Sequence, residues 1–404
     1  MTSLIRVAAA TGMFLLAALD AFAQNRSITI GVLEDGSGLY ADATGAGSTL
    51  ATQMAVEDSG LEKRGWSIRV LAADHQNKAD IATSIARRWI DVEKADAIVG
   101  LGNSAVALSI NHVARETNRV AVVTSGGTSD LTGKACSPNT VHWTYDTYAL
   151  ARSAGTEMTK AGGKTWFFIT ADYSFGHALQ RDTTEAVQKA GGKVLGDIKH
   201  PLNSSDFSSF LLQAQGSNAD VIAFANAGAD ATNSIKQAAE FGLTKSKQTI
   251  ASLLMFLTDV KALGLAIAQG LNLTATFYWD LNDGTRMFSE RFAKRMSNGA
   301  VPTMPQAGTY AGTLHLLKAI EALNGDTSDG KAVIAKMKAI PKNDQLFGKG
   351  EIRADGRAIH PVYTFQVKSP AESKGPWDLY KVVSTTPGNE GFRPINEGGC
   401  PLLK

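Results

Sequence analysis

Short apolar runs and amphipathic helical segments alternate along the first part of this chain, and that alternation limits the folds open to it. Over residues 79–92, Ile81, Ile85 and Trp89 recur four residues apart, which is one buried stripe of a helix. The strand-like runs are continuously apolar, as expected when helices cover both faces of a sheet. We predict strands at 28–33, 67–73, 97–100 and 120–123, and helices at 48–58, 79–92 and 105–116.

The same rhythm begins again after Tyr145. Two consecutive blocks of this kind predict an α/β protein with two doubly wound parallel sheets rather than one long sheet. In the second block we predict strands at 165–170, 193–198, 221–225 and 249–251, and helices at 148–161, 175–190, 206–215 and 229–241.

The C-terminal part of the chain breaks this rhythm. The patterns predict a strand at 270–277, helices at 286–296 and 306–324, and strands at 346–352, 363–368 and 379–384. We expect the late strand and the two helices to return to the first block. Each lobe is then discontinuous, and several crossing segments form a hinge.

The first residues have the pattern of a secretory signal. Arg6 precedes an apolar run over 7–19, and Ala21-Phe22-Ala23 supplies a small-x-small cleavage pattern before Gln24. The run is shorter than the roughly 20 residues that span a bilayer, and no cysteine follows it for lipid attachment. We predict cleavage near Ala23 and a soluble periplasmic protein that is not embedded in the membrane.

Charge and cysteine content narrow the partners and the compartment. The chain has 40 basic and 38 acidic residues and no basic stripe, so we expect no nucleic-acid partner. Its two cysteines are Cys136 and Cys400. In an oxidising compartment an isolated pair usually forms a disulfide, which would tie the C-terminal tail to the first lobe. Two free buried thiols are the alternative.

A glycine-rich turn at 36–41 fits the pattern G-x-G-x-x-A of dinucleotide-binding proteins, and Asp74 ends the next strand where a ribose-binding acid would lie. Three observations oppose a nucleotide. Residues 42–47 prolong the loop before the helix, no G-K-[ST] follows, and an exported protein has no ready supply of a soluble nucleotide. We therefore predict no cofactor.

Motifs of hydrolases and metal enzymes are incomplete. Residues 102–106 lack the second glycine of a nucleophile elbow, and no S-x-x-K lies nearby. The seven histidines are dispersed without H-E-x-x-H, and two cysteines cannot make a cysteine-based zinc site. His75 and His142 lie at strand ends and are candidates to touch a cleft. We predict no catalytic residues and no metal.

Small polar residues cluster at the carboxyl ends of two predicted strands. Asn103 and Ser104 follow the third strand, and residues 124–128 follow the fourth. Ligands of open α/β sheets bind just beyond these ends, and the free N–H groups of the helix after Ser104 suit a carboxylate. Gly126 and Gly127 bare the backbone. Ordinary capping and turn chemistry is the alternative.

Aromatic residues gather at strand ends and between the two blocks. We expect about half of them to touch a ligand in an interlobe cleft and the others to be core. They are Tyr40, Trp143, Tyr145, Tyr148, Tyr173, Phe175, Trp279 and Tyr310.

Over the whole mature sequence the chain resembles the periplasmic solute-binding proteins of ABC transporters, in the leucine/isoleucine/valine-binding group. The motifs that carry the resemblance are Ser37-Gly38, residues 100–104, 124–128 and 172–176, and Phe347-Gly348, all in the family's order. Asp280-Leu281-Asn282-Asp283 and Gly399-Cys400-Pro401 look like the subgroup that takes up aromatic acids.

The resemblance implies the type I Venus-flytrap architecture. Two Rossmann-like lobes are joined by three crossover segments, and a ligand is trapped as the lobes close. We expect lobe 1 at 27–145 plus 276–355, lobe 2 at 146–275 plus 356–385, and a tail at 386–404 that returns to lobe 1 after a signal peptide at 1–23. The expected partners are a small carboxylate and the permease subunits of an ABC transporter.

Relatives hold the ligand's α-carboxylate with positions that match Ser104, Gly126 and Thr128. They pair the ligand ammonium with a second-lobe acid, but residues 252–257 hold no acid here, and a second-lobe tyrosine is replaced near Asn226. A buried ammonium without a counter-charge is costly. We therefore predict a carboxylate without an α-amino group: benzoate-like, phenylpropenoid or an aryl 2-oxo acid. The predicted ligand-binding residues are Ser37, Tyr40, Asn103, Ser104, Ser125, Gly126, Thr128, Tyr145, Tyr173, Phe175, Leu254 and Met255.

Three alternatives stay open. Asp172 or Asp230 could supply the missing charge, which would make the ligand a branched-chain or other amino acid. The same fold also serves ligand sensors. The third alternative is an exported dehydrogenase or hydrolase.

Overall fold

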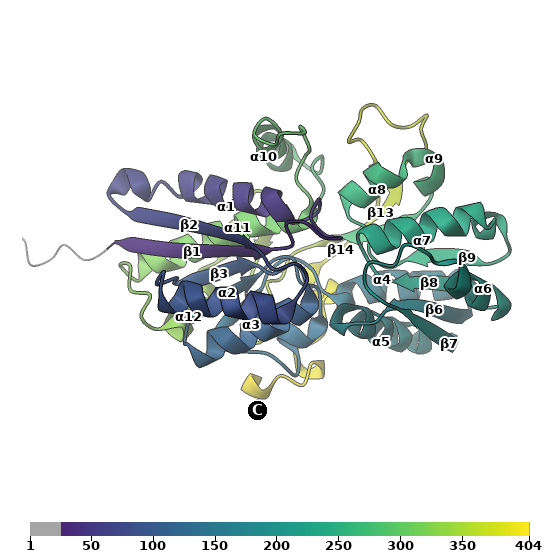
Figure 1. Cartoon of the computed structure of the whole chain (residues 1–404), viewed down its shortest axis with the longest axis horizontal. Coiled ribbons are helices and arrows are strands. Elements are labelled where there is room, and N and C mark those ends of the chain that lie inside the picture. Colours follow the sequence, from purple (N-terminus) through teal and green to yellow (C-terminus); the bar gives the residue numbers. More distant parts are fainter. Residues whose placement is uncertain (1–25, 404) are drawn as a thin grey trace, which may run out of the picture.

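The first lobe is built on a sheet around β1 (Ser27–Glu34), which is buried after its first residue. The computed structural model describes residues 26–403, so the predicted signal peptide lies outside the described residues. Five parallel strands run in the order β2-β1-β3-β4-β5 (Figure 1). The others are β2 (Ser67–Asp74), β3 (Ala97–Gly100), β4 (Val120–Val123) and β5 (Thr140–His142). The four predicted strands are confirmed, and β5 is an addition.

Helices cover both faces of this sheet. On one face, α1 (Gly45–Ser59) packs against α11 (Met304–Ala322), which returns from the C-terminal part of the chain. On the other, α2 (Ala79–Asp91) packs against α3 (Ser104–Glu116). The first face shares a core with Ile30 and Val32, whereas Leu33 belongs to the core of the second. α12 (Gly330–Ala339), which was not predicted, contacts β4.

The second lobe has a parallel sheet with the strand order β7-β6-β8-β9. Its strands are β6 (Thr165–Ala171), β7 (Lys193–His200), β8 (Val221–Ala225) and β9 (Thr249–Ser252), all at the predicted places. The predicted helices are α4 (Thr147–Lys160), α5 (Ser174–Lys189), α6 (Ser208–Gly216) and α7 (Ala229–Glu240). Two short helices after β9, α8 (Leu257–Leu263) and α9 (Leu265–Ala268), were not predicted. The α/β fold with parallel sheets in two lobes is therefore confirmed.

The chain passes between the lobes more than once. It leaves the first sheet after β5, and β10 (Asn272–Ala275) later joins the antiparallel strands β13 (Val362–Val367) and β14 (Tyr380–Thr386). Between β10 and β13 the chain forms α10 (Asp283–Ala293), α11 and α12. The strand predicted at 346–352 is shorter: β12 (Gly348–Gly350) pairs with β11 (Lys342–Asp344) as a small hairpin.

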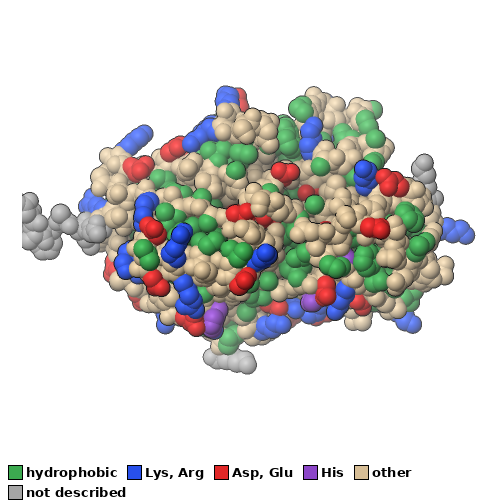
Figure 2. All heavy atoms as spheres, in the orientation of Figure 1, with side chains coloured by type: hydrophobic (Ala, Val, Ile, Leu, Met, Phe, Trp, Pro, Cys, Tyr) green, Lys and Arg blue, Asp and Glu red, His purple; other side chains and the backbone are tan. Residues whose placement is uncertain are grey.

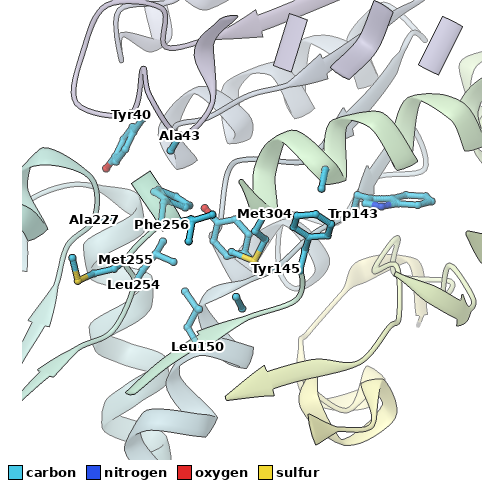
Figure 3. Packing of buried hydrophobic residues seen from close by; sticks show 14 of the residues in the cluster. Tyr40, Ala43, Trp143, Tyr145, Leu150, Ala227, Leu254, Met255, Phe256 and Met304 are labelled. Carbon is cyan, nitrogen blue, oxygen red and sulfur yellow. The ribbon is translucent and has the colours of Figure 1, made fainter. Parts of the chain in front are cut away.

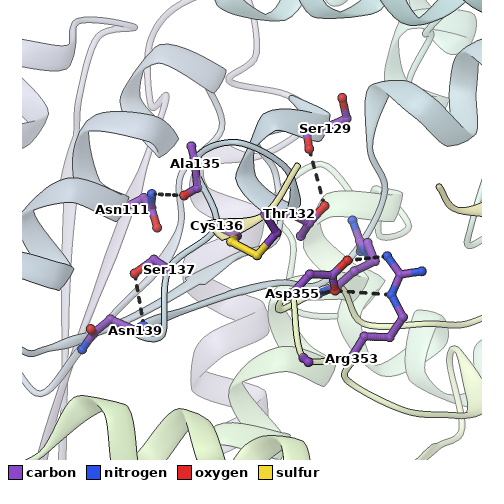
Figure 4. The surroundings of a disulfide bond; sticks show 12 residues. Asn111, Ser129, Thr132, Ala135, Cys136, Ser137, Asn139, Arg353 and Asp355 are labelled. Carbon is purple, nitrogen blue, oxygen red and sulfur yellow. Dashed lines mark hydrogen bonds and ion pairs between the residues drawn. A yellow bond between two sulfur atoms is a disulfide. The ribbon is translucent and has the colours of Figure 1, made fainter. Parts of the chain in front are cut away.

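The predicted disulfide between Cys136 and Cys400 is present, with its Cα atoms 5.5 Å apart (Figure 4). It joins a segment that follows β4 to the tail that follows β14. The short helices α13 (Gly388–Gly391), η5 (Ile395–Glu397) and η6 (Pro401–Leu403) make up most of that tail. Because the bond closes a loop across 264 residues, it restricts the unfolded chain strongly.

Charged side chains of both signs are interspersed over the face shown in Figure 2. This pattern agrees with the near balance of acidic and basic residues in the sequence. Within residues 26–403, no helix is both long and apolar enough to cross a membrane.

Candidate functional site

The loop after β4 meets the start of α3 at the carboxyl edge of the first sheet. Asn103 caps this helix, because its side-chain oxygen accepts a hydrogen bond from the Ala105 amide at 2.8 Å. The hydroxyl of Ser104 accepts one from the Thr128 amide at 3.1 Å. All three predicted residues, Asn103, Ser104 and Thr128, are buried. Parallel strand ends therefore bring together two segments that lie 24 residues apart.

Glycines let this loop pass close to its surroundings. A Cβ atom on Gly126 would lie 2.7 Å from the Leu101 carbonyl oxygen, and one on Gly127 would lie 2.8 Å from the Tyr145 ring and 2.9 Å from the Phe175 ring. His142 Nε2 donates to the Gly126 carbonyl at 2.7 Å. Burial and the nearby Arg357 hold the pKa of His142 well below its ordinary value, so the ring is neutral.

Tyr145 lies in the connection from the first sheet to the second and is bonded at both ends. Its hydroxyl donates to the Ser125 carbonyl at 2.7 Å. Its carbonyl accepts from Arg357 Nη1 at 3.2 Å, and the same guanidinium lies 3.5 Å from the Asp146 carboxylate. Arg357 is fully buried and belongs to the segment that leads to β13. Two connections between the lobes are thus tied together and hold the loop after β4.

Residues of the two lobes meet around Tyr40 (Figure 3). Its hydroxyl bonds to the hydroxyl of Tyr173, which directly precedes α5 in the second lobe. Beside it, the Ala229 amide at the start of α7 donates to the Leu39 carbonyl at 3.3 Å. Burial raises the pKa of both tyrosines, so both hydroxyls stay protonated. The loop after β1 is therefore a contact between the lobes.

Apolar side chains from β9 onward complete the wall of the second lobe. Leu254 and Met255 are buried in the same core cluster as Tyr40, Tyr145 and Phe175 (Figure 3). The ring of Phe256 packs edge-on against Tyr145 with 6.3 Å between centroids. A cavity of about 10 Å³ lies beside Met255 and Phe256. In this arrangement side chains of the two lobes fill the space between them.

Ser37 is apart from this cluster. It is exposed, and its hydroxyl donates to the Asp74 carboxylate at 2.5 Å. Asp74 also accepts from the Gly36 amide at 3.0 Å, so the acid considered for a ribose binds the glycine-rich turn itself. α1 begins only at Gly45. Hydrogen bonds to Asp74 therefore hold the turn in place, apart from the other site residues.

Three buried acids lie near the site, and none is among the predicted ligand-binding residues. Of the three, only Asp230 was considered from the sequence, as a possible counter-charge for an amino acid. Glu34 ends β1 and is 3% exposed. In the second lobe, Asp259 accepts from the Phe256 amide at 2.8 Å, and Asp230 accepts from the Ser204 amide at 2.9 Å. Burial raises the pKa of Asp259 to about 7 and that of Asp230 to about 6. An acid inside an apolar strand, as at position 34, is the signal that could have identified the first.

Among the residues described, no group of three or more histidine, cysteine or acidic side chains is arranged to hold a metal ion. The buried His142 and His360 each donate a hydrogen bond from Nε2 to a backbone carbonyl. Burial lowers the pKa of both.

Similarity to known proteins extends over most of the chain. The family model described as periplasmic binding protein matches residues 27–376. A periplasmic binding protein from Burkholderia mallei is 48% identical, with a TM-score of 0.90, covering 94% of this chain and all of that one.

Two further solved structures are similar to this chain. A branched-chain amino acid ABC transporter periplasmic ligand-binding protein from Burkholderia xenovorans is 36% identical, with a TM-score of 0.82, covering 93% of this chain and all of that one. A solute-binding protein of an R. palustris ABC transporter, solved in complex with benzoate, is 22% identical with a TM-score of 0.79. The match covers 90% of this chain and 97% of that one, and it shows the shared fold.

Proposed function

This chain belongs to the periplasmic binding protein family, the solute-binding components of ABC transporters, and from that premise we propose that it captures a small aromatic carboxylate and delivers it to an importer. The ligand favours the closed arrangement of the lobes, and the permease recognises that arrangement. The observation that carries the proposal is the loop after β4, whose Thr128 amide bonds to Ser104 at the start of α3 and whose Gly127 lies against the rings of Tyr145 and Phe175.

The proposal assigns 27–145 with 276–355 to lobe 1, 146–275 with 356–385 to lobe 2, and 386–404 to the returning tail. Strand membership supports these bounds, since β1 to β5 share one sheet and β6 to β9 another. A signal peptide over 1–23 belongs to the same proposal.

The carboxylate end of the ligand is assigned to the start of α3 and the loop after β4. The Ser104 hydroxyl and the Thr128 amide now bond to each other, and an entering carboxylate would replace that bond with two charge-assisted ones. The helix N-terminus adds a favourable dipole. Gly126 has no side chain to block the approach.

The apolar end of the ligand is assigned to Tyr145, Phe175, Leu254 and Met255. These side chains are buried in one cluster, so opening the lobes exposes apolar surface that a ring would cover again. Tyr40 and Tyr173 are assigned to the mouth of the cleft. Ser37 and Asn103 are assigned to its first-lobe side, and Ser125 to the loop after β4. The R. palustris structure with benzoate shows that this fold accommodates such a ligand.

An amino acid is the second candidate, because a 36% identical relative is described as a branched-chain amino acid protein and Asp230 and Asp259 lie in the second lobe. Both carboxylates, however, are bonded to backbone amides. Burial also raises their pKa values, which disfavours the charged form that an ammonium requires. These facts favour the aromatic acid.

A thermal-shift screen tests the assignment, with benzoate, 4-hydroxybenzoate, cinnamate and phenylpyruvate set against leucine and valine. A ligand at 100 times its Kd stabilises the protein by about 2.7 kcal/mol, which raises Tm measurably. We expect a shift with at least one aromatic acid and none with the amino acids. A shift with leucine or valine alone would refute the ligand assignment.

The proposal includes no catalysis and no nucleic-acid partner. A sensor role would use the same ligand and lobes, and adjacent permease and ATPase genes would distinguish the two. Turnover of a nicotinamide cofactor or an ester, abolished by Ser104→Ala, would overturn the non-enzymatic assignment.

A further inference from the structure

The carboxyl group of Glu34 is buried beside the loop after β4 (residues 124–128), which is proposed to bind the ligand. Glu34 Oε1 accepts a hydrogen bond from the Ser125 hydroxyl at 2.6 Å. Glu34 Oε2 is buried as well. The buried Ser48 hydroxyl, on α1, and the Gly102 amide lie close enough to this carboxyl to lower its pKa. The carboxyl is therefore enclosed by polar groups from three segments of the first lobe.

The connection from β3 to α3 is shaped around this carboxyl. Cβ atoms on Gly100 and on Gly102 would each lie 2.6 Å from an oxygen of Glu34. Any other residue at these two positions would displace the carboxyl. Glu34 therefore touches both proposed carboxylate-binding segments, the one that leads to Ser104 and the one that begins at Ser125.

Among the described residues, the ionisable groups that act on Glu34 are one acid and one phenol, with no cation. Asp35 is next in the chain, and its carboxylate accepts from the Gly38 and Tyr40 amides. Tyr145 faces Glu34 from the connection between the lobes as a neutral phenol. Burial raises the pKa of Glu34 to about 8, and the hydrogen-bonding groups of Ser125, Ser48 and Gly102 only partly oppose that effect. At neutral pH the carboxyl is therefore protonated and uncharged.

We propose that Glu34 is a positioning residue. By keeping or losing its proton, it decides whether an anion binds at Ser104, which begins α3, and at Ser125 and Thr128 in the loop after β4. This inference rests on the proposed function and deepens it. When Glu34 is neutral, it orients Ser125 without repelling a carboxylate. When it is ionised, it adds a negative charge under the same donors, and like charges in a closed cleft repel each other.

The pH dependence of ligand affinity follows from this arrangement. Binding of an anion favours the neutral form of Glu34, so its pKa is higher in the complex than in the free protein. Glu34 then contributes no pH dependence to the Kd below about pH 7.5, where Asp230 and Asp259 of the second lobe titrate. Above the free-protein pKa of Glu34 the Kd rises by up to about tenfold per pH unit, because each ligand must bring a proton back to Glu34.

Calorimetric titration with sodium benzoate between pH 6 and pH 9.5 tests the inference. Benzoate stays ionised across this range, so the protein is the source of any slope. We expect the wild-type Kd to rise above about pH 8, and we expect Glu34→Gln, which cannot ionise, to lose this rise. Glu157→Gln changes an exposed carboxyl on α4 and should keep the wild-type slope. Circular dichroism at each pH verifies that every variant is folded.

A second variant keeps the test decisive if Glu34→Gln does not fold. The Ser125 hydrogen bond lowers the pKa of Glu34, so Ser125→Ala should move the onset of weakening to higher pH. A flat wild-type profile, or an equal slope in Glu34→Gln, overturns the inference and leaves the ligand assignment intact. A Kd that falls as pH rises also overturns the inference, because benzoate carries no cation that an ionised Glu34 could attract. If benzoate does not bind, the titration uses the aromatic acid that shifts Tm in the screen, and absence of a shift with all of these acids overturns both proposals.

Discussion

At the scale of single residues, Ser104 has the most direct consequence for binding. Its buried hydroxyl lies at the first residue of α3 and already accepts one hydrogen bond. Hydrogen bonds to charged groups contribute about 1.5–3 kcal/mol. We therefore expect Ser104→Ala to weaken binding of an aromatic acid by about ten- to hundredfold, as measured by calorimetric titration, with Tm changed by only a few degrees.

Ser109 offers a matched control on the same helix, five residues further along. Ser109→Ala removes a hydroxyl from α3 outside the proposed site, so its Kd should equal that of the wild type. If both variants bind equally well, the carboxylate end of the ligand lies elsewhere.

Residue types at strand ends were predictable, whereas their partners were not. Ser104 and Thr128 could be selected because parallel strands end at one edge of a sheet. Asp259 was missed because its partners are backbone amides, which leave no mark in the sequence. An acid at the end of an apolar strand marked Glu34 as unusual, but its neighbours Gly100, Gly102 and Ser125 are brought around it only by the fold.

At the scale of elements, the start of α3 couples stability to binding. Asn103 caps this helix through the amides of Ala105 and Val106. Loss of such a cap costs about 1 kcal/mol, so we expect Asn103→Ala to lower the free energy of unfolding by that amount in a urea titration. Asn103→Asp keeps a capping oxygen but adds a negative charge beside the proposed carboxylate site. That variant should remain stable and lose affinity by tenfold or more.

The two variants separate capping from charge. Equal affinity in Asn103→Asp and the wild type would contradict a carboxylate site at this helix end, whatever their stabilities. Equal stability in Asn103→Ala and the wild type would contradict the capping role.

Long apolar runs made most elements predictable from the sequence, and short or polar ones were missed. β3, β4 and β8 have the predicted bounds because each is a fully buried run. β5 has only three residues and depends on pairing with β4. α12 begins at a glycine and carries three lysines, which obscured its apolar face.

At the scale of the whole molecule, a polar cluster joins the lobes on the side of the disulfide. Asp182 on α5 of the second lobe accepts from the Ser129 hydroxyl at 2.7 Å and lies 3.5 Å from Arg393 of the tail. Arg181 reaches Asp130 of the first lobe at 3.1 Å. Since the Cys136–Cys400 bond ties the tail to the first lobe, Arg393 and Ser129 together hold Asp182 in the closed arrangement.

We expect opening of the lobes to separate Asp182 from Ser129, so that this cluster stabilises the closed form selectively. Asp182→Asn removes the charge and weakens these bonds, and a shift of the equilibrium toward open protein raises the apparent Kd in proportion. We expect about a tenfold increase in Kd, because bonds to a buried charge contribute about 1.5–3 kcal/mol. Small-angle X-ray scattering should also show a larger radius of gyration without ligand.

Gln188→Ala, an exposed change on the same helix that alters no charge, should leave both measurements at their wild-type values. Replacing Cys136 and Cys400 together by serine should act in the same direction as Asp182→Asn, because the untethered tail no longer positions Arg393. If Asp182→Asn lowers Tm while Kd and the radius of gyration stay unchanged, the cluster stabilises the fold without favouring closure. If the cluster favours closure, Asp182→Asn must both raise the Kd and expand the ligand-free protein. A loss of general stability alone would not change both quantities.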